Sequence, residues 1–516
     1  MSLYDYIVVG SGSAGAVITR RLVDAGARVL LLEAGGPDSN PNIHEPSGLF
    51  NLWLTDEDWG YFTVAQKYCH NRQLHWPRGK VLGGSSGLNG MIYVRGNPQD
   101  YDTWASLGNY GWSYDEVLPY FKKSEDFDGG ASHYHGVGGP LRVISQFTPH
   151  PATAAFVAAA QETGLAYNPD CNAETQDGVG YCHLTIKDGQ RHSTAEAFLR
   201  PVESQPNLTI ATRARARRLL FEGPRCVGVE YAQGGRLERA EASIEVIVSA
   251  GTLESPKLLM LSGIGQGDAL RRLGLTVVSD LPGVGQNLHD HMLVPIIHAA
   301  KRPLPPPMPG LQQLHGQLFA RSTPGLATPD TQPLFFHLPL YAPDMQGPAD
   351  GYTLMAGMIR PASRGYLAIT SAEPDAEMVI DPDYFAQDAD MEAMLFSVEQ
   401  CREILQAEAL GEWRDQELYP GPQVRTREQL RDYLRAQAVT YHHQVGTCKM
   451  GVDAEAVVDP ELRVYGVSGL RVADASIMPL VTSGNTHAPA IMIGEKAADL
   501  LLATQSVRPH LAAEQA

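Results

Sequence analysis

The sequence has few cysteines, no surplus of positive charge and no long apolar run. Its six cysteines are scattered over 516 residues without a CxxC pair, which indicates reduced, intracellular thiols rather than a disulfide framework. The formal net charge of -18 argues against a nucleic acid or an anionic membrane as partner, because both attract basic surfaces. No apolar run reaches the roughly 18–20 residues of a membrane helix, and no signal segment precedes the first predicted strand. We therefore expect a soluble cytoplasmic protein.

The composition itself is ordinary for a globular chain. Hydrophobic residues make up 43% of the sequence and charged residues 19%, which leaves room for a large core. At about 150 residues per domain, the length suggests two to four domains. No internal repeat is apparent.

The first 35 residues have the pattern of a dinucleotide-binding unit. A predicted buried strand at 7–9 is followed by the glycines Gly10, Gly12 and Gly15, a helix, and a second strand that ends at Glu33. In this context the first glycine permits a tight turn, the second lets the backbone approach a pyrophosphate, and the third lets the helix pack on the strand. The helix N-terminus then faces the phosphates, and the glutamate can accept hydrogen bonds from ribose hydroxyls. The pattern alone leaves NAD and FAD open.

The middle of the chain has a different character. The glycine- and serine-rich residues 76–96 predict a loop, and alternating residues at 208–223 and 228–235 predict strands of a meander. A further buried strand is predicted over 245–251, with a helix directly after it. Residues 301–350 are rich in proline and glycine and predict long loops, which would form an access lid, a contact arm or a plain surface excursion.

The last third returns to regular elements. Amphipathic helices are predicted over 388–406 and 426–438, and a buried strand over 470–473. A final helix is predicted with Pro489 in its first turn, where proline is tolerated. Because buried strand and helix return at the end of the chain, we expect the cofactor domain to be discontinuous.

Residues 441–451, YHHQVGTCKMG, place two adjacent histidines before a Gly-Thr turn and a cysteine. A metal site, a thiol nucleophile, a proton-transfer base and packing are all conceivable there. Adjacent side chains point apart on a strand and about 100° apart on a helix, so the two histidines make a poor metal pair, and no metal is predicted. Cys448 has no partner acid nearby and is interpreted as a buried thiol.

Several segments together resemble the glucose-methanol-choline (GMC) oxidoreductases. The resemblance extends from about residue 4 to 503 and lies in the N-terminal glycine unit and in residues 79–96, 251–265, 443–451 and 469–500. It implies FAD rather than NAD, and an α/β fold in which an FAD-binding Rossmann-like domain is joined to a substrate-binding domain with an antiparallel sheet. The FAD-binding domain is expected over 1–150, 205–290 and 455–506, the substrate-binding domain over 151–204 and 291–454, and a tail over 507–516.

The same resemblance implies the cofactor contacts. Some members attach the flavin to a histidine at the position of Leu88, so we expect non-covalent FAD. Asp474 ends a buried strand, where its carboxylate or backbone would meet the pyrophosphate or ribityl end. The expected contacts are Gly10, Gly12, Ser13, Ala14, Gly15, Glu33, Ala34, Val81, Gly83, Gly84, Ser85, Asn89, Gly90, Met91, Ile92, Ala216, Ala250, Gly251, Asp474, Ala475, Asn485 and His487.

For catalysis the resemblance points to the histidines. His443 precedes the Gly-Thr turn by three residues and is expected to be the base, because a neutral imidazole accepts protons near neutral pH. His487 is expected at the second active-site position, bound to the substrate oxygen. His442 stands where the family usually has Tyr or Phe and is interpreted as a ring that packs or shapes the pocket. The final helix and Asn485 are expected near the flavin pyrimidine edge.

The substrate is constrained least. Residues 334–341, LFFHLPLY, are expected to line the substrate domain and contain no acid for a quaternary ammonium, which disfavours choline. We expect oxidation of a small aromatic or heteroaromatic primary alcohol to an aldehyde, with oxygen or another electron acceptor. Aliphatic alcohols, choline and sugars remain alternatives, as do a hydroxynitrile lyase of the same fold, an NAD-dependent dehydrogenase and a non-enzymatic flavin-binding protein. The oligomeric state stays open.

Overall fold

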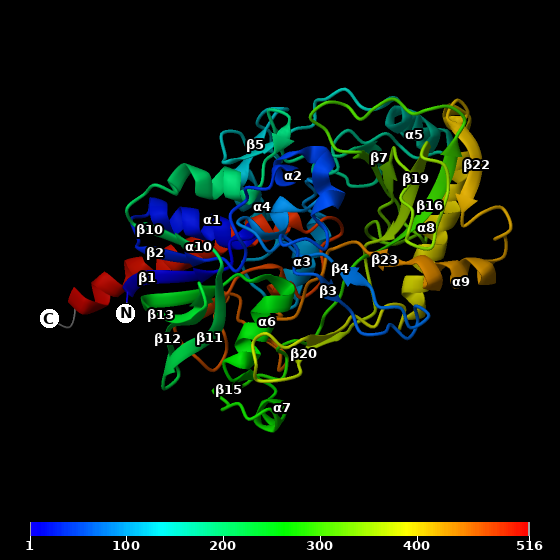
Figure 1. Cartoon of the computed structure of the whole chain (residues 1–516). Helices are drawn as coiled ribbons and strands as arrows, with labels where there is room; N and C mark the ends of the chain where they lie inside the picture. Colours follow the sequence, from blue (N-terminus) through cyan, green and yellow to red (C-terminus); the bar gives the residue numbers. More distant parts are fainter. Residues whose placement is uncertain (1, 514–516) are drawn as a thin grey trace.

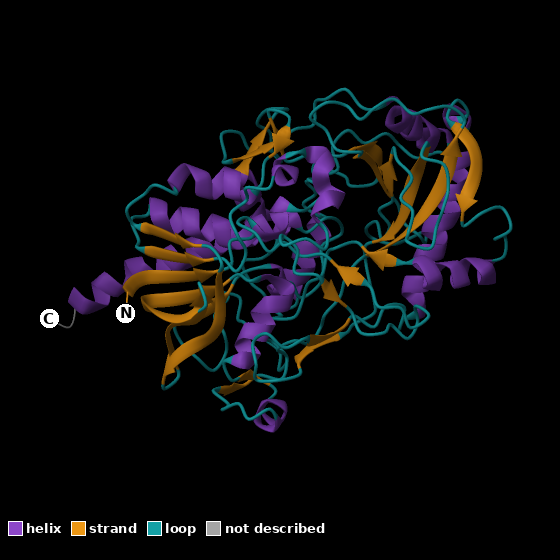
Figure 2. Ribbon diagram, viewed as in Figure 1, coloured by secondary structure: helices purple, strands orange, loops and turns teal. Residues whose placement is uncertain are grey.

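Two large β-sheets organise the molecule (Figure 1). The computed structural model describes residues 2–513, and the side chains of residues 3–504. Figure 2 shows the first sheet with helices beside it on one side of the molecule and the second sheet, with its own helices, on the other. The first strand, β1 (Ser2–Val9), and the start of the last helix, α10 (His487–Ala513), lie on the same side of the molecule (Figure 1). The architecture is the predicted α/β fold with a second, antiparallel sheet.

The first sheet joins a parallel part to an antiparallel meander through one shared strand. The parallel strands, in spatial order, are β10 (Leu208–Ala211), β2 (Val29–Leu32), β1 (Ser2–Val9), β13 (Arg236–Val248) and β24 (Leu470–Val472). The meander adds β12 (Arg225–Gln233) and β11 (Ala214–Glu222). The buried strand predicted over 245–251 is the end of β13, whose first residues are exposed while its last four are buried. The change from polar to apolar sequence marks the entry of one strand into the core.

Helix α1 (Ser13–Asp24) packs on β1 and β2, and α10 (His487–Ala513) packs on α1 and on α4 (Tyr114–Ser124). After α1 the chain turns at Gly26, whose φ of +84° is a conformation that glycine adopts easily at a helix end. The last helix has proline in its first turn, as predicted. It also continues through residues 507–513, which the sequence led us to expect as a tail.

The second sheet is antiparallel throughout. Its strands, in spatial order, are β22 (Arg414–Tyr419), β16 (Met292–Ala300), β19 (Gly351–Met358), β18 (Leu334–Phe336), β17 (Leu314–Phe319) and β7 (Gly178–Tyr181), with β23 (Val439–Thr440) beside β16. Two of these strands lie within 301–350, so the prediction of loops throughout that segment is wrong. Both strands are fully buried, so their sequence shows no alternation of apolar and polar residues from which a strand could be predicted. Their backbone N–H and C=O groups are satisfied by pairing with neighbouring strands. Helices α5 (Pro151–Glu162) and α8 (Asp388–Gln406) pack against this sheet.

The remaining elements are short strand pairs and further helices. The strands are β3 (Tyr61–Phe62), β4 (His75–Trp76), β5 (Glu125–Phe127), β6 (Leu141–Val143), β8 (Ile186–Lys187), β9 (Gln190–Arg191), β14 (Ile264–Gly265), β15 (Ser279–Asp280), β20 (Tyr366–Ile369) and β21 (Met378–Asp381). The helices are α2 (Pro41–His44), α3 (Pro98–Ser106), α6 (Gly251–Leu261), α7 (Gly267–Arg272) and α9 (Arg427–Gln437). The helices predicted at 388–406 and 426–438, and after residue 251, are thereby confirmed.

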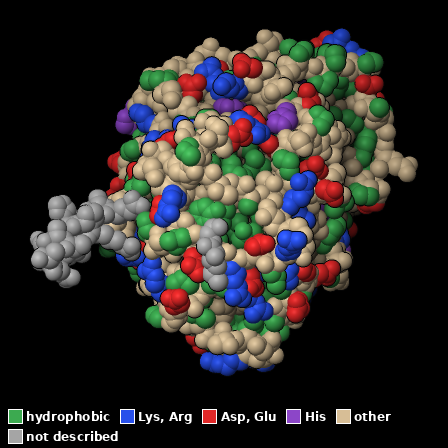
Figure 3. All heavy atoms as spheres, turned by 60° about the vertical axis from the view of Figure 1, so that its left-hand side comes forward, with side chains coloured by type: hydrophobic (Ala, Val, Ile, Leu, Met, Phe, Trp, Pro, Cys, Tyr) green, Lys and Arg blue, Asp and Glu red, His purple; other side chains and the backbone are tan. Residues whose placement is uncertain are grey.

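All six cysteines are buried as free thiols, as the sequence predicted. Among the residues that the structure describes, no helix has the length and apolarity required to cross a membrane. Figure 3 shows acidic and basic side chains interspersed over one face of the molecule.

Candidate active site

A cavity of about 1000 Å³ is lined by residues from both sheets and the loops between them. Its lining is mostly apolar, and its size lies at the upper end of the roughly 300–1000 Å³ of small-molecule sites. Of the predicted cofactor residues, Gly15, Val81 and Gly83 do not line it. Those that do are Gly10, Gly12, Ser13, Ala14, Glu33, Ala34, Gly84, Ser85, Asn89, Gly90, Met91, Ile92, Ala216, Ala250, Gly251, Asp474, Ala475, Asn485 and His487. The candidate base His443 also lines the cavity.

The three glycines between β1 and α1 meet different surroundings. A Cβ on Gly10, whose φ is +98°, would lie 2.4 Å from the carbonyl oxygen of Ser249. A Cβ on Gly15 would lie 2.0 Å from the carbonyl oxygen of Gly10, so this glycine permits the close helix packing that the motif predicts. Around a Cβ on Gly12 the nearest heavy atom is 4.0 Å away. The protein itself leaves that space open, as backbone in contact with a ligand phosphate would require.

Glu33 follows β2 and turns its carboxylate back to the glycine loop. Its Oε2 accepts hydrogen bonds from the Ser11 backbone N–H at 3.1 Å and the Ser11 hydroxyl at 2.5 Å, and its Oε1 accepts one from the Gly35 backbone N–H at 2.7 Å. Burial raises the pKa of this carboxyl, although these hydrogen bonds oppose the shift. Glu33 therefore holds the loop in shape and still lines the cavity, where its oxygens can accept further hydrogen bonds.

The segment at 79–96 brings a second glycine turn against the first. The Ser11 hydroxyl accepts a hydrogen bond from the Gly83 backbone N–H at 3.0 Å, and a Cβ on Gly84 would lie 2.8 Å from the Gly12 Cα. The side-chain oxygen of Asn89 accepts hydrogen bonds from the Met91 backbone N–H at 3.0 Å and from Arg191 at 2.7 Å. Gly83 thus holds the two glycine turns together behind the cavity wall, and Asn89 holds the wall itself through contacts within the protein.

Asp474 is used differently from the expectation that its carboxylate could meet phosphates. The carboxylate accepts hydrogen bonds from the Gly251 backbone N–H at 2.8 Å, the Ser255 hydroxyl at 2.5 Å and the Ser476 backbone N–H at 2.8 Å. Burial raises the pKa of this carboxyl, and the hydrogen bonds act against that shift. Its carboxylate holds the start of α6 in place, which leaves the backbone of Asp474 and Ala475 at the cavity.

His443 lies in the segment that follows β23 and is held on several sides. The Asp290 carboxylate accepts a hydrogen bond from its backbone N–H at 2.8 Å, and the Tyr441 ring stacks on its imidazole with ring centroids 4.5 Å apart. Asp290 also accepts hydrogen bonds from the hydroxyls of Tyr384 and Thr440, each at 2.5 Å. A buried carboxylate with several donors thus fixes the backbone that positions the imidazole.

The Asn485 amide, and not His487, contacts the imidazole of His443, and the role of His487 at the substrate oxygen stays a prediction. The Asn485 Nδ2 lies 3.2 Å from the His443 Nε2, whereas the His487 Nδ1 lies 2.8 Å from the Ser13 hydroxyl at the start of α1. Residue 485 precedes α10 while residue 487 begins it, and the two side chains therefore leave the backbone in different directions. His487 lines the cavity on the glycine-loop side, and its Nε2 has no hydrogen-bond partner among the described residues.

Burial lowers the pKa of His442, His443 and His487, which line the cavity. It lowers the pKa of His487 to about 4 and that of His442 to about 3, and it lowers the pKa of His443 well below 6.5. For His443, the positive charges that His291, His442 and Arg78 can bear act in the same direction. Near neutral pH the imidazole of His443 is therefore uncharged and able to accept a proton.

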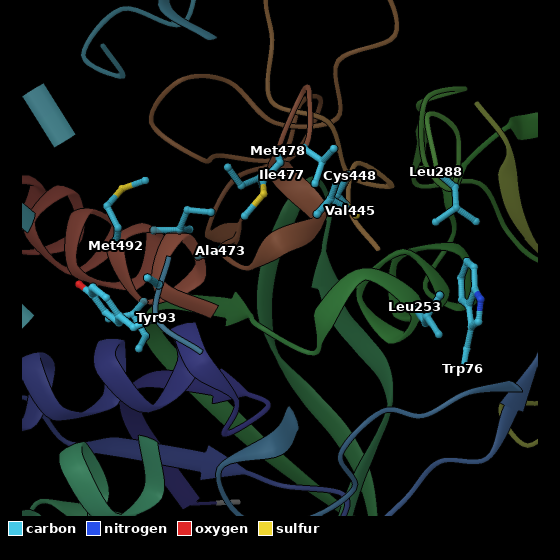
Figure 4. Packing of buried hydrophobic residues seen from close by; sticks show 14 of the residues in the cluster. Trp76, Tyr93, Leu253, Leu288, Val445, Cys448, Ala473, Ile477, Met478 and Met492 are labelled. Atoms are coloured by element: carbon cyan, nitrogen blue, oxygen red, sulfur yellow. The ribbon is translucent and has the colours of Figure 1, made fainter. Parts of the chain in front are cut away.

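His442 and Cys448 pack against other side chains, as predicted from the sequence. The ring of His442 lies 5.3 Å from that of Trp53, and its backbone carbonyl accepts a hydrogen bond from Arg78 at 2.8 Å. Cys448 is fully buried; Figure 4 shows it near Ile477 in the core. Burial raises the pKa of its thiol well above the ordinary value, which argues against a thiolate nucleophile.

The sequence reasoning missed several residues around the base. Asp290 and His291 end a loop directly before β16, and Arg78 and Gln332 come from other segments. The sequence HDH at 289–291 was the available signal, since three titratable residues before a buried strand are unusual. Nothing in the linear order joins them to residue 443, more than 150 positions later.

The chain matches known proteins over most of its length. Residues 4–293 and 361–494 match the two family models described as GMC oxidoreductase. The chain is similar to mitochondrial choline dehydrogenase of Homo sapiens, with 44% identity over 96% of this chain and 89% of that protein. It is similar to alcohol dehydrogenase (acceptor) of Pseudomonas putida, with 40% identity over 97% and 96% of the two chains. Its structure is similar to that of pyridoxine 4-oxidase from Mesorbium loti, with a TM-score of 0.92, 36% identity, and coverage of 96% and 98%.

Proposed function

Because the chain belongs to the GMC oxidoreductase family, we propose that it oxidises a small aromatic or heteroaromatic primary alcohol to the aldehyde, with His443 as the base. GMC oxidoreductases bind FAD and act on alcohols, and this chain is an FAD-dependent alcohol oxidoreductase. The observation that supports the role of His443 is the 3.2 Å contact between its Nε2 and the Asn485 amide at the wall of one cavity.

The residues around the cavity support this cofactor. The open space beside Gly12 and the N-terminus of α1 suit a pyrophosphate, and Glu33 suits the ribose. The partnerless Nε2 of His487 suits a polar edge of the flavin. Leu88 has no nucleophilic atom, which supports non-covalent FAD. We infer that residues 1–150, 205–290 and 455–506 form the FAD-binding domain, and residues 151–204 and 291–454 the substrate-binding domain.

Bound FAD supplies a hydride acceptor for the carbon that bears the hydroxyl. The side chains of this protein handle the proton and the geometry. Nε2 of His443 takes the hydroxyl proton while the carbon loses its hydride, so the C–O single bond becomes the carbonyl of the aldehyde. Asn485 donates a hydrogen bond to the same oxygen and holds it at the base. Both His443 and Asn485 line the cavity.

The lining supports an uncharged substrate. The segment 334–341 lines the cavity, as expected, through Leu334, Phe336 and Leu340. Trp53 and Tyr441 line it as well. Three carboxylates line the cavity, and each is engaged within the protein: Glu33 and Asp474 as described above, and Glu254, which accepts a hydrogen bond from the Tyr61 hydroxyl at 2.5 Å. A quaternary ammonium would therefore meet aromatic rings but no free carboxylate.

Choline is a second candidate, favoured by the 44% identity to a choline dehydrogenase. Aromatic rings can bind a quaternary ammonium without a carboxylate, and Trp53, Phe50 and Tyr441 line the cavity. Aliphatic alcohols, sugars and a hydroxynitrile-lyase type of reaction follow as weaker alternatives, because no feature of the lining favours them.

The cofactor assignment predicts a clear difference between two glycines. Gly12→Val should fold, since a Cβ there meets no heavy atom closer than 4.0 Å, and should purify without flavin because its side chain fills the phosphate space. Gly15→Ala should lose stability instead, since its Cβ would lie 2.0 Å from a carbonyl oxygen. Thermal melting and the flavin absorbance of each purified protein measure both effects. A fully flavinated Gly12→Val protein would refute the assignment.

The substrate is tested by an anaerobic titration of the purified protein, monitored by visible absorbance. The panel contains benzyl alcohol, furfuryl alcohol, pyridoxine, choline and hexanol. Bleaching at low concentrations of an aromatic or heteroaromatic alcohol is expected, and preferential bleaching by choline would overturn the substrate class. The rate at which the flavin absorbance returns in air shows whether oxygen serves as the electron acceptor. If dithionite bleaches the flavin and no alcohol does, the redox proposal fails and the lyase reaction is the next to test.

A further inference from the structure

Four side chains form one continuous hydrogen-bonded chain through the base. The Gln332 Nε2 lies 3.0 Å from the Asn485 Oδ1, the Asn485 Nδ2 lies 3.2 Å from the His443 Nε2, and the His443 Nδ1 lies 3.0 Å from the His291 Nδ1. Gln332 and His291 are fully buried. Neither of these two residues lines the cavity, so neither can touch a substrate there directly.

The order of donors along this chain is set from the Gln332 end. The Gln332 amide group donates through Nε2 to the Asn485 Oδ1, so the Asn485 Nδ2 must face His443. An amide nitrogen has hydrogens to donate and no lone pair to accept with. The Nε2 of His443 is therefore the acceptor, and its one lone pair points at the Asn485 amide, at the wall of the cavity.

The other end of the chain completes the assignment. A neutral imidazole has one N–H, so a lone pair on the His443 Nε2 places its hydrogen on Nδ1. Only one hydrogen can lie between the two Nδ1 atoms. Because His443 supplies this hydrogen, the Nδ1 of His291 must be the acceptor. Burial lowers the pKa of His291 to about 3, so His291 is neutral and has the required lone pair.

We propose that His291 and Gln332 are positioning residues that together keep the hydrogen of His443 on Nδ1 and a lone pair on Nε2. The inference rests on the proposed function, in which Nε2 of His443 receives the hydroxyl proton of the substrate. When that proton reaches Nε2, the Asn485 N–H releases Nε2 and donates to the substrate oxygen, while the Nδ1–H of His443 still donates to His291, so no second proton needs to move. A histidine oriented by another group is a general device for base catalysis, and here the orienting group is neutral.

The test compares variants that remove each end of the chain without removing volume. His291→Phe removes the acceptor for Nδ1–H, and Gln332→Met removes the donor to Asn485. Each should lower kcat for the alcohol identified above by about 10²-fold, the scale of a small misplacement of catalytic groups. KM, flavin content and the melting temperature should change little. His291→Asn restores an acceptor near the position of Nδ1 and should recover most of the loss.

Two further proteins separate positioning from general damage. His298→Phe makes the same substitution on β16 at a buried histidine whose ring nitrogens have no hydrogen-bond partners among the described residues, and its kcat should match the wild type. Combined with His443→Ala, His291→Phe should cause no additional loss, because a residue that acts through the base has no effect once the base is gone.

The outcomes are distinguishable. If His443→Ala retains full turnover, the proposed function fails. If His443→Ala is inactive while His291→Phe and Gln332→Met both keep the wild-type kcat, only the positioning role is overturned. An additive loss in the double variant, or a His291→Asn protein as impaired as His291→Phe, would also overturn it. If His291→Phe yields no flavinated protein, the same comparison is made with Gln332→Met alone and in the His443→Ala background.

Discussion

Two buried histidines of this molecule have opposite surroundings. His135 has a carboxylate at each ring nitrogen, with Nδ1 3.1 Å from Glu125 and Nε2 2.8 Å from Asp170. Burial lowers its pKa, yet the hydrogen bonds to the two carboxylates outweigh burial and raise the pKa above 6.5. His443 instead contacts the neutral groups of His291 and Asn485, and burial lowers its pKa well below 6.5.

The difference teaches that partners, more than burial, decide what a histidine does. His135 belongs to a buried network in which Arg95 lies 2.8 Å from Glu125, and none of these residues lines the cavity. The raised pKa favours its charged form, which interacts with two carboxylates and stabilises the fold. His443 faces the cavity with no carboxylate at its ring nitrogens, so its imidazole stays neutral and free to accept a proton.

The largest effect is expected when the two histidines are removed in turn. His443→Ala should retain the yellow flavin and lose turnover by about 10²–10⁴-fold, the usual contribution of a general base. His135→Phe should keep its kcat at a temperature where it is folded, because it lies outside the cavity. Steady-state kinetics with flavin-normalised enzyme measure both. Equal losses of kcat in the two variants would contradict the different roles of the two histidines.

Removing one partner of the charged network should cost stability. Glu125→Gln leaves the Arg95 guanidinium buried without its carboxylate, and breaking such a pair costs about 3–5 kcal/mol. The matched control is Glu230→Gln, whose partner Arg239 is largely exposed and whose loss should cost about 0–1 kcal/mol. Thermal melting compares the two proteins. A melting temperature of Glu125→Gln as high as that of the control would contradict a stabilising network.

The smallest effect is a difference in pH dependence. The pKa of His135 is raised in the folded protein, so its contribution is present in full below the unfolded value of 6.5 and is lost as pH rises through the folded pKa. The melting temperature of the wild type should therefore exceed that of His135→Phe most below pH 6.5, and the gap should narrow at higher pH. For His443 the folded-state pKa is lowered, so the pH dependence has the opposite sign. Its burial as a neutral imidazole lowers the free energy of unfolding as pH falls below 6.5. If the difference in melting temperature between the wild type and His135→Phe widened with rising pH, the raised pKa of His135 would be contradicted.

Much of the fold could be predicted because local patterns specify it. The glycine unit at residues 10–15, the helices at 388–406 and 427–437 and the buried strand at 470–472 follow from periodicity and turn residues. β17 and β18 could not be found this way. They are short and lie among prolines and glycines, and only their pairing with β7 and β19 makes them strands.

The motif predicts that His443 lies at the cavity, whereas the orientation of the neighbouring side chains could not be predicted from it. His443 lines the cavity, as the base would require. His487 and Asn485 are two residues apart, and only the three-dimensional path into α10 shows that Asn485 contacts the base while His487 contacts Ser13. Asp290 lies far from residue 443 in sequence, and only the pairing of their backbones brings its carboxylate to the His443 N–H.

The most direct measurement is the rate of flavin reduction by the preferred alcohol, followed anaerobically by rapid mixing from about pH 5 to about pH 8. Our account holds that His443 acts as a neutral base among neutral groups, with its pKa well below 6.5. It predicts a rate constant that stays level through pH 6.5 and falls only at lower pH. A rate constant that falls with an apparent pKa at or above 6.5 would contradict it.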